Sequence, residues 1–295
     1  MKKCLSGLFF MFFLQACEKD IKIKLDPSDN KLVVEASIEN GMAPVVILTQ
    51  SLDYFNKIDP GALQSSFVKN AVVTITDGTR TQQLNPDSIQ SDEGAKIYFY
   101  TSPANASTPM LGKLNTTYQL SIQVAGQTYR ASTTIPTITR TIDSMWWEKL
   151  PSTEIKDTGF ARVMIKATDK PGLGDYIRYY TKVGSREPFF PGFNSVFDDQ
   201  IIDGKTYTIP IDRGFNRNAE FTDSSAFYHK GDTVTLKLCQ IDKATYDFWR
   251  TYEFSFQSIG NPFSSPTRIL SNINNDALGY FGGYGCVYRT IIIPK

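Results

Sequence analysis

The 295-residue chain has a single histidine, four cysteines and no surplus of positive charge, because 31 lysines and arginines are balanced by 30 aspartates and glutamates. A lone histidine excludes histidine-rich zinc sites and leaves one candidate base for a Ser-His or Cys-His mechanism. The balanced charge argues against a nucleic-acid partner, since binding to a polyphosphate depends on clustered cations. These absences disfavour most familiar enzyme classes.

Sequence motifs of several reaction types are also missing. The chain has no Gly-x-Ser-x-Gly elbow for a nucleophilic serine and no Cys-x-x-Cys pair for redox chemistry. His229 lies in a turn before an expected strand, and we do not expect it to be catalytic. Two carboxylate pairs, Asp198 with Asp199 and Glu220 with Asp223, are interpreted as solvated loop charge rather than glycosidase residues. We therefore predict that the protein is not an enzyme and has no catalytic residues.

Residues 272–276, Asn-Ile-Asn-Asn-Asp, offer oxygen ligands of the kind that Ca²⁺ accepts. The segment lacks the glycine and the distal glutamate of an EF-hand loop, so we interpret it as an asparagine-rich turn. No glycine-rich loop precedes a helix, which leaves nucleotide binding without support. The sequence therefore predicts neither a metal site nor a cofactor.

The first 17 residues are typical of a targeting segment. A short basic stretch precedes the apolar run Leu5–Phe13, which is shorter than the about 20 residues of a membrane-spanning helix. The end of this segment, Leu14–Cys17, resembles the bacterial lipobox, in which the chain is cut before the cysteine and the cysteine is acylated. The resemblance implies a signal peptide at 1–16, lipid attachment at Cys17 and a lipidated tether at 17–30. An uncleaved apolar tail is the alternative.

Acidic residues stand directly behind the lipobox cysteine. Glu18 and Asp20 resemble the export signal that carries lipoproteins of Bacteroidota to the outer face of the outer membrane. The resemblance implies an outer-membrane, lipid-anchored protein on the cell surface.

Strand-length runs rich in β-branched residues begin at residue 31. Leu32–Ile38, Val45–Leu48 and Ala71–Thr76 are such runs, and dipeptides such as Asn40-Gly41 supply the turns between them. Short strands at this spacing predict an all-β fold, with an immunoglobulin-like β-sandwich over 31–140.

The segment 141–295 is predicted to be a second, β-rich, sandwich-like domain that ends in a strand from Cys286 to Ile293. One segment differs, because Asp242 is a suitable N-cap for an amphipathic helix near 243–258. Aromatic residues recur on one face of this helix, and we expect them to pack on a sheet as core, with a sugar-stacking platform as the alternative. They are Tyr246, Trp249, Tyr252 and Phe256.

The cysteines restrict each other's roles. Cys4 leaves with the signal peptide and Cys17 takes the lipid, so Cys239 and Cys286 are the thiols that remain. Both stand in expected strands of the second domain, and the cell exterior permits oxidation. A disulfide between them and two buried free thiols both stay open at this stage.

Four phenylalanines occur within residues 186–197, among two prolines and a glycine. The prolines exclude a regular central strand, because proline donates no ladder hydrogen bond. The rings either fill a gap in the core or form a partner-binding surface, since aromatic side chains are enriched in interface cores. The candidate partner-binding residues are Phe189, Phe190, Phe193 and Phe197.

Several motifs together resemble one known family. They are Lys31–Glu35, Thr133–Pro136, Asp169–Gly172 and Gly279–Tyr284, and they are similar to motifs of the DUF4249 lipoproteins of Bacteroidota. Members of that family sit beside genes for TonB-dependent outer-membrane receptors, which implies an accessory role at a transport barrel. The family supplies no catalytic residues.

The function that these observations favour is that of a surface lipoprotein, the accessory or docking subunit of a TonB-dependent transporter in nutrient capture. The expected partners are that receptor and, through the N-terminal lipid, the membrane. A free-standing adhesin or glycan-binding lipoprotein is the alternative, and a carboxylate-based hydrolase is a third.

Overall fold

A computed structural model describes residues 30–52, 60–90, 94–103, 105–150, 159–219, 222, 224–261, 263–265 and 267–295. Cys17, the signal peptide, almost all of the tether, Glu220 and Asp223 lie outside the described residues. Strands dominate the described chain, which confirms the predicted all-β, sandwich-like fold. Neither helix in the described ranges has the length and apolar character needed to cross a membrane.

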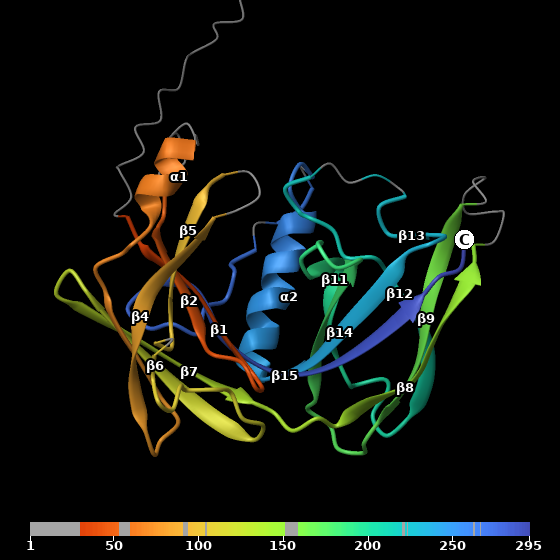
Figure 1. Cartoon of the computed structure of the whole chain (residues 1–295), viewed down its shortest axis with the longest axis horizontal. Helices are drawn as coiled ribbons and strands as arrows, with labels where there is room; N and C mark the ends of the chain where they lie inside the picture. Colours follow the sequence, from red (N-terminus) through yellow and green to blue (C-terminus); the bar gives the residue numbers. More distant parts are fainter. Residues whose placement is uncertain are drawn as a thin grey trace, which may run out of the picture.

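One large sheet runs through the whole molecule (Figure 1). Its strands, in spatial order, are β11 (Phe190–Asp198), β10 (Tyr176–Val183), β14 (Thr233–Ile241), β15 (Leu278–Ile292), β1 (Leu32–Glu39), β2 (Val45–Gln50), β5 (Lys96–Thr101), β4 (Thr81–Gln90), β3 (Val72–Thr76), β6 (Thr116–Val124) and β7 (Gln127–Ile135). A smaller sheet places β9 (Phe160–Asp169) against β8 (Arg140–Lys149), β12 (Thr206–Ile211) and β13 (Tyr228–His229). The helices are α1 (Pro60–Ser66) and α2 (Lys243–Gln257).

Strand β4 turns the large sheet into a sandwich. Its first residues pair with β3 up to Leu84, and its remaining residues, from Asn85, pair with β5. The change of partner lies next to Pro86, which has no N–H to donate to a ladder. A buried core fills the space between the two layers, with Val34, Ile75 and Leu120 among its residues.

The last strand, β15, joins the two halves of the molecule. Residues 278–284 pair in parallel with β1 of the sandwich, and residues 284–292 pair antiparallel with β14 of the second half. The expected terminal strand, Cys286–Ile293, is thus only the second part of a longer strand. The first part is rich in glycine, which strands usually avoid, and this composition hides it from a propensity argument. Phe281 from this part is fully buried in the sandwich core, so the C-terminal residues return to the N-terminal half.

Two adjacent glycines of β15 allow close crossings on opposite faces of the strand. A Cβ on Gly282 would stand 2.9 Å from the Thr245 side chain of α2, and one on Gly283 would stand 2.7 Å from the backbone of Thr134 in β7. Real Cβ atoms do not approach other atoms so closely. These glycines are therefore required by the packing of α2 and β7, not by a turn.

Helix α2 forms where the sequence predicts it. The Asp242 carboxylate accepts a hydrogen bond from the Thr245 amide at 2.8 Å, which satisfies one of the free N–H groups of the first turn. Tyr246 and Phe248 are buried against the large sheet. Figure 1 shows α2 in the middle of the molecule, between the sandwich and the second half.

A second core lies on the other face of β10 and β14. There Ile177, Tyr179, Leu236 and Leu238 pack against Ile165 and Ala167 of the smaller sheet. The two faces of β10 and β14 therefore have different roles, since one is closed by a sheet and the other is covered by α2.

Candidate ligand-binding cleft

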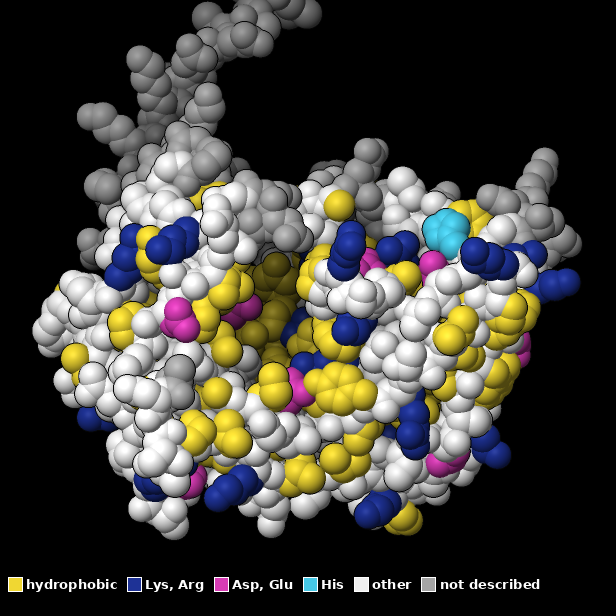
Figure 2. All heavy atoms as spheres, in the orientation of Figure 1, with side chains coloured by type: hydrophobic (Ala, Val, Ile, Leu, Met, Phe, Trp, Pro, Cys, Tyr) yellow, Lys and Arg dark blue, Asp and Glu magenta, His cyan; other side chains and the backbone are white. Residues whose placement is uncertain are grey.

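Polar and aromatic side chains gather on the α2-facing side of the large sheet. Strand pairing aligns Glu35 with Tyr280, Arg178 with Cys239, and Cys239 with Cys286. Residues at every second position of a strand share a face, so these strands contribute one continuous surface. Figure 2 shows that this side of the molecule is hollowed near its middle, with hydrophobic and basic side chains in the recess.

We call this hollow the central cleft. Its volume is about 280 Å³. It is lined by Glu35, Arg178, Tyr180, Phe190, Pro191, Phe215, Arg217, Trp249, Tyr252 and Tyr280. A smaller hollow of about 190 Å³ continues from it, shares Tyr180 and Tyr280, and adds Lys237 and Glu39. Two larger hollows, near α1 and beside Asn272, are lined by no buried charged residue in the described chain, and in a third the buried charge, Arg140, is paired with Asp169. The central cleft is therefore the better candidate site.

Arg178 is the most unusual residue of the cleft, because its side chain is charged and the residue is only 2% exposed. Its Nε donates a hydrogen bond to Ser195 Oγ at 3.2 Å. Its guanidinium carbon lies 3.3 Å from the ring centroid of Trp249 and 4.7 Å from that of Tyr180. These contacts place the guanidinium over the indole and stabilise its charge. Among the described residues, the hydrogen bond from Nε is the one that its guanidinium makes.

A second buried charge, Glu253 of α2, fixes the wall opposite the sheet. Its carboxylate accepts hydrogen bonds from the Ser195 amide at 3.0 Å and from Arg217 Nη2 at 2.8 Å. Ser195 also donates its hydroxyl to Glu253 and accepts from Arg178, so one chain of contacts joins β10, β11 and α2. Arg217 keeps two buried nitrogens, Nε and Nη1, that lack an acceptor among the described residues. The cleft therefore contains arginine N–H groups that the protein itself does not use.

Glu35 contributes the carboxyl group of the cleft. The low-dielectric surroundings raise its pKa, and the positive charge of Arg178 opposes part of that shift. The charged form of Glu35 is thus disfavoured in the folded protein. Glu39, further along β1, forms an ion pair with Lys237 and accepts a hydrogen bond from Tyr288. Glu39 is therefore already engaged outside the central cleft.

Only part of this site could be anticipated from the sequence. The spacing and composition single out Trp249, Tyr252 and Phe190, although the helix face was expected to be core. Arg178, Arg217 and Glu35 were not expected to be site residues. A usable signal for Glu35 was the alternation Glu35-x-Ser37-x-Glu39 in β1, which predicts one polar face on a strand whose other face is core.

The four candidate phenylalanines lie on or beside strand β11, which is an edge strand with a break in its register, as its prolines require. Phe189, Phe190 and Phe193 are half-buried, and Phe197 is 42% exposed. Phe190 lines the central cleft and Phe189 lines its continuation. Phe197 stacks against Tyr179 with ring centroids 6.2 Å apart. Partner binding by these rings stays a prediction.

Cys239 and Cys286 stand directly opposite each other in β14 and β15 and form a disulfide. Their Cα atoms are 3.9 Å apart. The bond lies in the cluster under α2 that also contains Tyr246, Tyr280 and Tyr284. It therefore links β14 to β15, the strand that supplies Tyr280 to the cleft.

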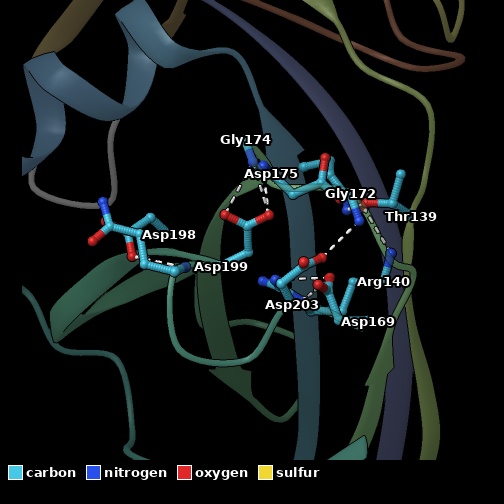
Figure 3. A network of polar contacts seen from close by, with 11 residues as sticks. Thr139, Arg140, Asp169, Gly172, Gly174, Asp175, Asp198, Asp199 and Asp203 are labelled. Carbon is cyan, nitrogen blue, oxygen red and sulfur yellow. Dashed lines mark hydrogen bonds and ion pairs between the residues drawn. The ribbon is translucent and has the colours of Figure 1, made fainter. Parts of the chain in front are cut away.

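Aspartates of the β9–β10 turn, together with Asp199 at the end of β11, form a separate polar network (Figure 3). Asp169 pairs with Arg140 at 2.9 Å, both side chains being fully buried. Asp199 accepts hydrogen bonds from the amides of Gly174 and Asp175 at 2.9 and 3.0 Å. Burial, and then the charges of Asp169 and Asp199, raise the pKa of Asp175. Carboxylate oxygens of these three aspartates lie within 4.8 Å of one another.

Contacts within the protein engage these aspartates, although Arg140 Nη1 and Asp169 Oδ2 are buried without a hydrogen-bond partner among the described residues. Arg140 supplies a positive charge, and the carboxylate of Asp199 clamps the backbone of the turn. Of the pair Asp198–Asp199, Asp199 holds the turn and Asp198 accepts a hydrogen bond from Tyr246 at 3.1 Å.

The remaining residues singled out from the sequence have structural contacts. His229 packs on Phe160 with ring centroids 4.7 Å apart. Within 272–276, Asn274 accepts a hydrogen bond from the Arg130 amide, and Asn275 donates to the carbonyl of Thr128. The asparagine side chains thus dock this segment on β7.

A family model described as "Domain of unknown function (DUF4249)" matches residues 18–288 of the chain. No curated protein matches the chain. The match covers most of the sequence, so the chain belongs to the DUF4249 family, as its motifs predicted.

Proposed function

We propose that this DUF4249 protein is a lipoprotein of the outer membrane, exposed on the cell surface, that binds a small ligand in its central cleft. In this proposal it acts as an accessory subunit of a TonB-dependent transporter of Bacteroidota, in nutrient capture and without catalysis. The observation that carries ligand binding is the buried guanidinium of Arg178 at an open, aromatic-lined cleft. Such concave sites with a few fixed polar groups are typical of small-molecule binding.

The rigidity of the cleft supports this proposal. Glu253 ties β11 to α2, and the disulfide between Cys239 and Cys286 ties β14 to β15. A cleft that is preformed loses less conformational entropy on binding.

The alternative, a glycan-binding adhesin, has weaker support from the aromatic residues. Arg178 occupies one face of the Trp249 ring, and Tyr252 and Tyr280 meet the same ring edge-on at 5.5 and 4.8 Å between centroids. A sugar needs a free ring face for stacking, and these contacts leave little of the indole available.

Lipid attachment is tested by replacing Cys17 with alanine. We expect this variant to lose incorporation of labelled fatty acid and to leave the membrane fraction, because the proposed anchor is the acylated cysteine. A serine substitution at Cys4, inside the signal peptide, is the matched control and should keep the label. Normal labelling and fractionation of the Cys17 variant would contradict the lipoprotein proposal.

Docking on a transporter is tested by purifying the full-length protein from its own membranes in mild detergent. We expect a TonB-dependent barrel at stoichiometric yield. A lipoprotein that purifies alone and binds immobilised glycans would instead favour the adhesin.

A further inference from the structure

We infer that the ligand of the central cleft is a small organic anion, with a carboxylate bound by Arg178 and an apolar or aromatic group held between the ring side chains. This inference rests on the proposed function, because it names the class of ligand for the same cleft.

The unused donors are the first argument. The guanidinium of Arg178, a residue only 2% exposed, makes one hydrogen bond to the described residues, from Nε, which leaves its terminal nitrogens for a ligand. Burial of charged donors without partners is costly, so a site that retains them is suited to a ligand that supplies acceptors. Arg217, which lines the same cleft, has two further unpartnered nitrogens.

The charges give the second argument. The residues that line the cleft include two arginines and one carboxyl group, Glu35. The charge of Arg217 is offset by Glu253, which lies 2.8 Å from it. Burial disfavours the charged form of Glu35. Glu35 is thus the one lining carboxyl group left to offset Arg178, its charge is costly there, and an anionic ligand would compete with it for the guanidinium.

The geometry selects a planar anion. The guanidinium carbon of Arg178 lies 3.3 Å from the centroid of the Trp249 ring, so the indole covers that side of the group and a ligand must approach the guanidinium from another side. A guanidinium edge presents parallel N–H groups that match the two oxygens of a carboxylate. The volume of about 280 Å³ is at the small end for ligand pockets, which are about 300–1,000 Å³. Phe190, Tyr252 and Tyr280 provide walls for an apolar group.

The test compares two probes of similar shape, phenylacetate and its neutral amide phenylacetamide, by calorimetric titration of the full-length protein in detergent. We expect phenylacetate to bind at least about tenfold more tightly, since only the anion makes charge-assisted hydrogen bonds. Inorganic phosphate is the third probe, and we expect it to bind more weakly than phenylacetate because it has no apolar group.

Variants connect this binding to the named residues. Arg178→Met should weaken phenylacetate binding about tenfold or more and should leave phenylacetamide binding nearly unchanged. Arg289→Met is the matched control. Arg289 is exposed, and it lies nine positions after Tyr280 in β15, so its side chain points to the face of the strand away from the cleft. It should bind like the wild type. If Arg178→Met unfolds, Glu35→Gln decides, and it should strengthen phenylacetate binding without affecting the amide.

Three outcomes overturn the inference. They are equal affinity for the acid and the amide, no effect of Glu35→Gln or Arg178→Met on the acid, and no phenylacetate binding at millimolar concentration. If a barrel co-purifies while any of these occurs, the ligand class is wrong and the proposed function stands. If phenylacetate binds as expected and no barrel co-purifies, the transporter role fails and the anion site stands.

Discussion

The carboxylate of Asp242 caps helix α2 and also accepts hydrogen bonds from strand β7. One carboxylate oxygen accepts from the Thr245 amide in α2, at 2.8 Å. The other accepts from the Thr133 hydroxyl at 2.7 Å and from the Thr134 amide at 2.9 Å, both in β7. We therefore predict that Asp242→Ala destabilises the attachment of α2 to the sandwich as well as the helix.

The expected cost follows from the separate contacts. Loss of an N-cap costs about 1 kcal/mol. A partly buried amide such as that of Thr134, left without its charged acceptor, costs about 1–3 kcal/mol. Thr133 contributes less, because its hydroxyl still accepts a hydrogen bond from the Gly283 amide at 2.7 Å. The free energy of unfolding should fall by about 2–4 kcal/mol in total.

Urea unfolding followed by tryptophan fluorescence measures this change, and Trp249 in α2 is one of its reporters. The matched control is Asp247→Ala, which removes an aspartate from the same helix whose partner, Lys243, is largely exposed. That change should cost less than about 1 kcal/mol. Asp242→Asn should lie between the two, since asparagine still caps a helix but turns an N–H₂ group toward Thr134. Equal costs for the two alanine variants would refute the reasoning.

Replacing both Cys239 and Cys286 by alanine should lower the free energy of unfolding by about 2–4 kcal/mol, and alkylation of both thiols without a reductant would contradict the disulfide. Asp175→Asn should stabilise the protein at neutral pH more than at mildly acidic pH. The pKa of the Asp175 carboxyl is raised in the folded state, so the wild-type protein loses stability as the pH rises through that pKa, and asparagine removes this loss. Equal shifts of the urea midpoint at both pH values would exclude this. Phe197→Ala should change stability by less than about 1.5 kcal/mol, because its ring is 42% exposed, and should weaken capture of the barrel, whereas a large loss of stability would show that the ring is core.

Local patterns were sufficient for much of the fold. Residues 32–38 alternate between buried and less buried side chains, and β1 forms there with Val34, Ala36 and Ile38 in the core. Asp242 precedes α2 as its N-cap, as expected for a residue whose side chain can accept a hydrogen bond from the amide of the third helical residue. These features depend on neighbours within a few positions, which is why they could be predicted.

The central cleft could be predicted only in part. The spacing of Trp249 and Tyr252 places them on one helix face, but not which sheet residues they meet. Arg178 has no local signal, because an arginine in a strand is ordinarily exposed. Its burial follows from α2, which covers that face and places Trp249 on the guanidinium.

The sequence by itself determined the all-β class, the helix, the irregular strand around Pro191 and the single pairing open to the last two cysteines. The tertiary structure decided that β15 pairs in parallel with β1, which brings Asn40 and Cys286, 246 positions apart, into hydrogen-bond contact. Parallel strands are not joined by a tight turn, so no local sequence motif predicts their pairing. Gly282 and Gly283 are a further example: nothing within β15 requires glycine at these positions, and the reason is the close approach of α2 on one face and β7 on the other.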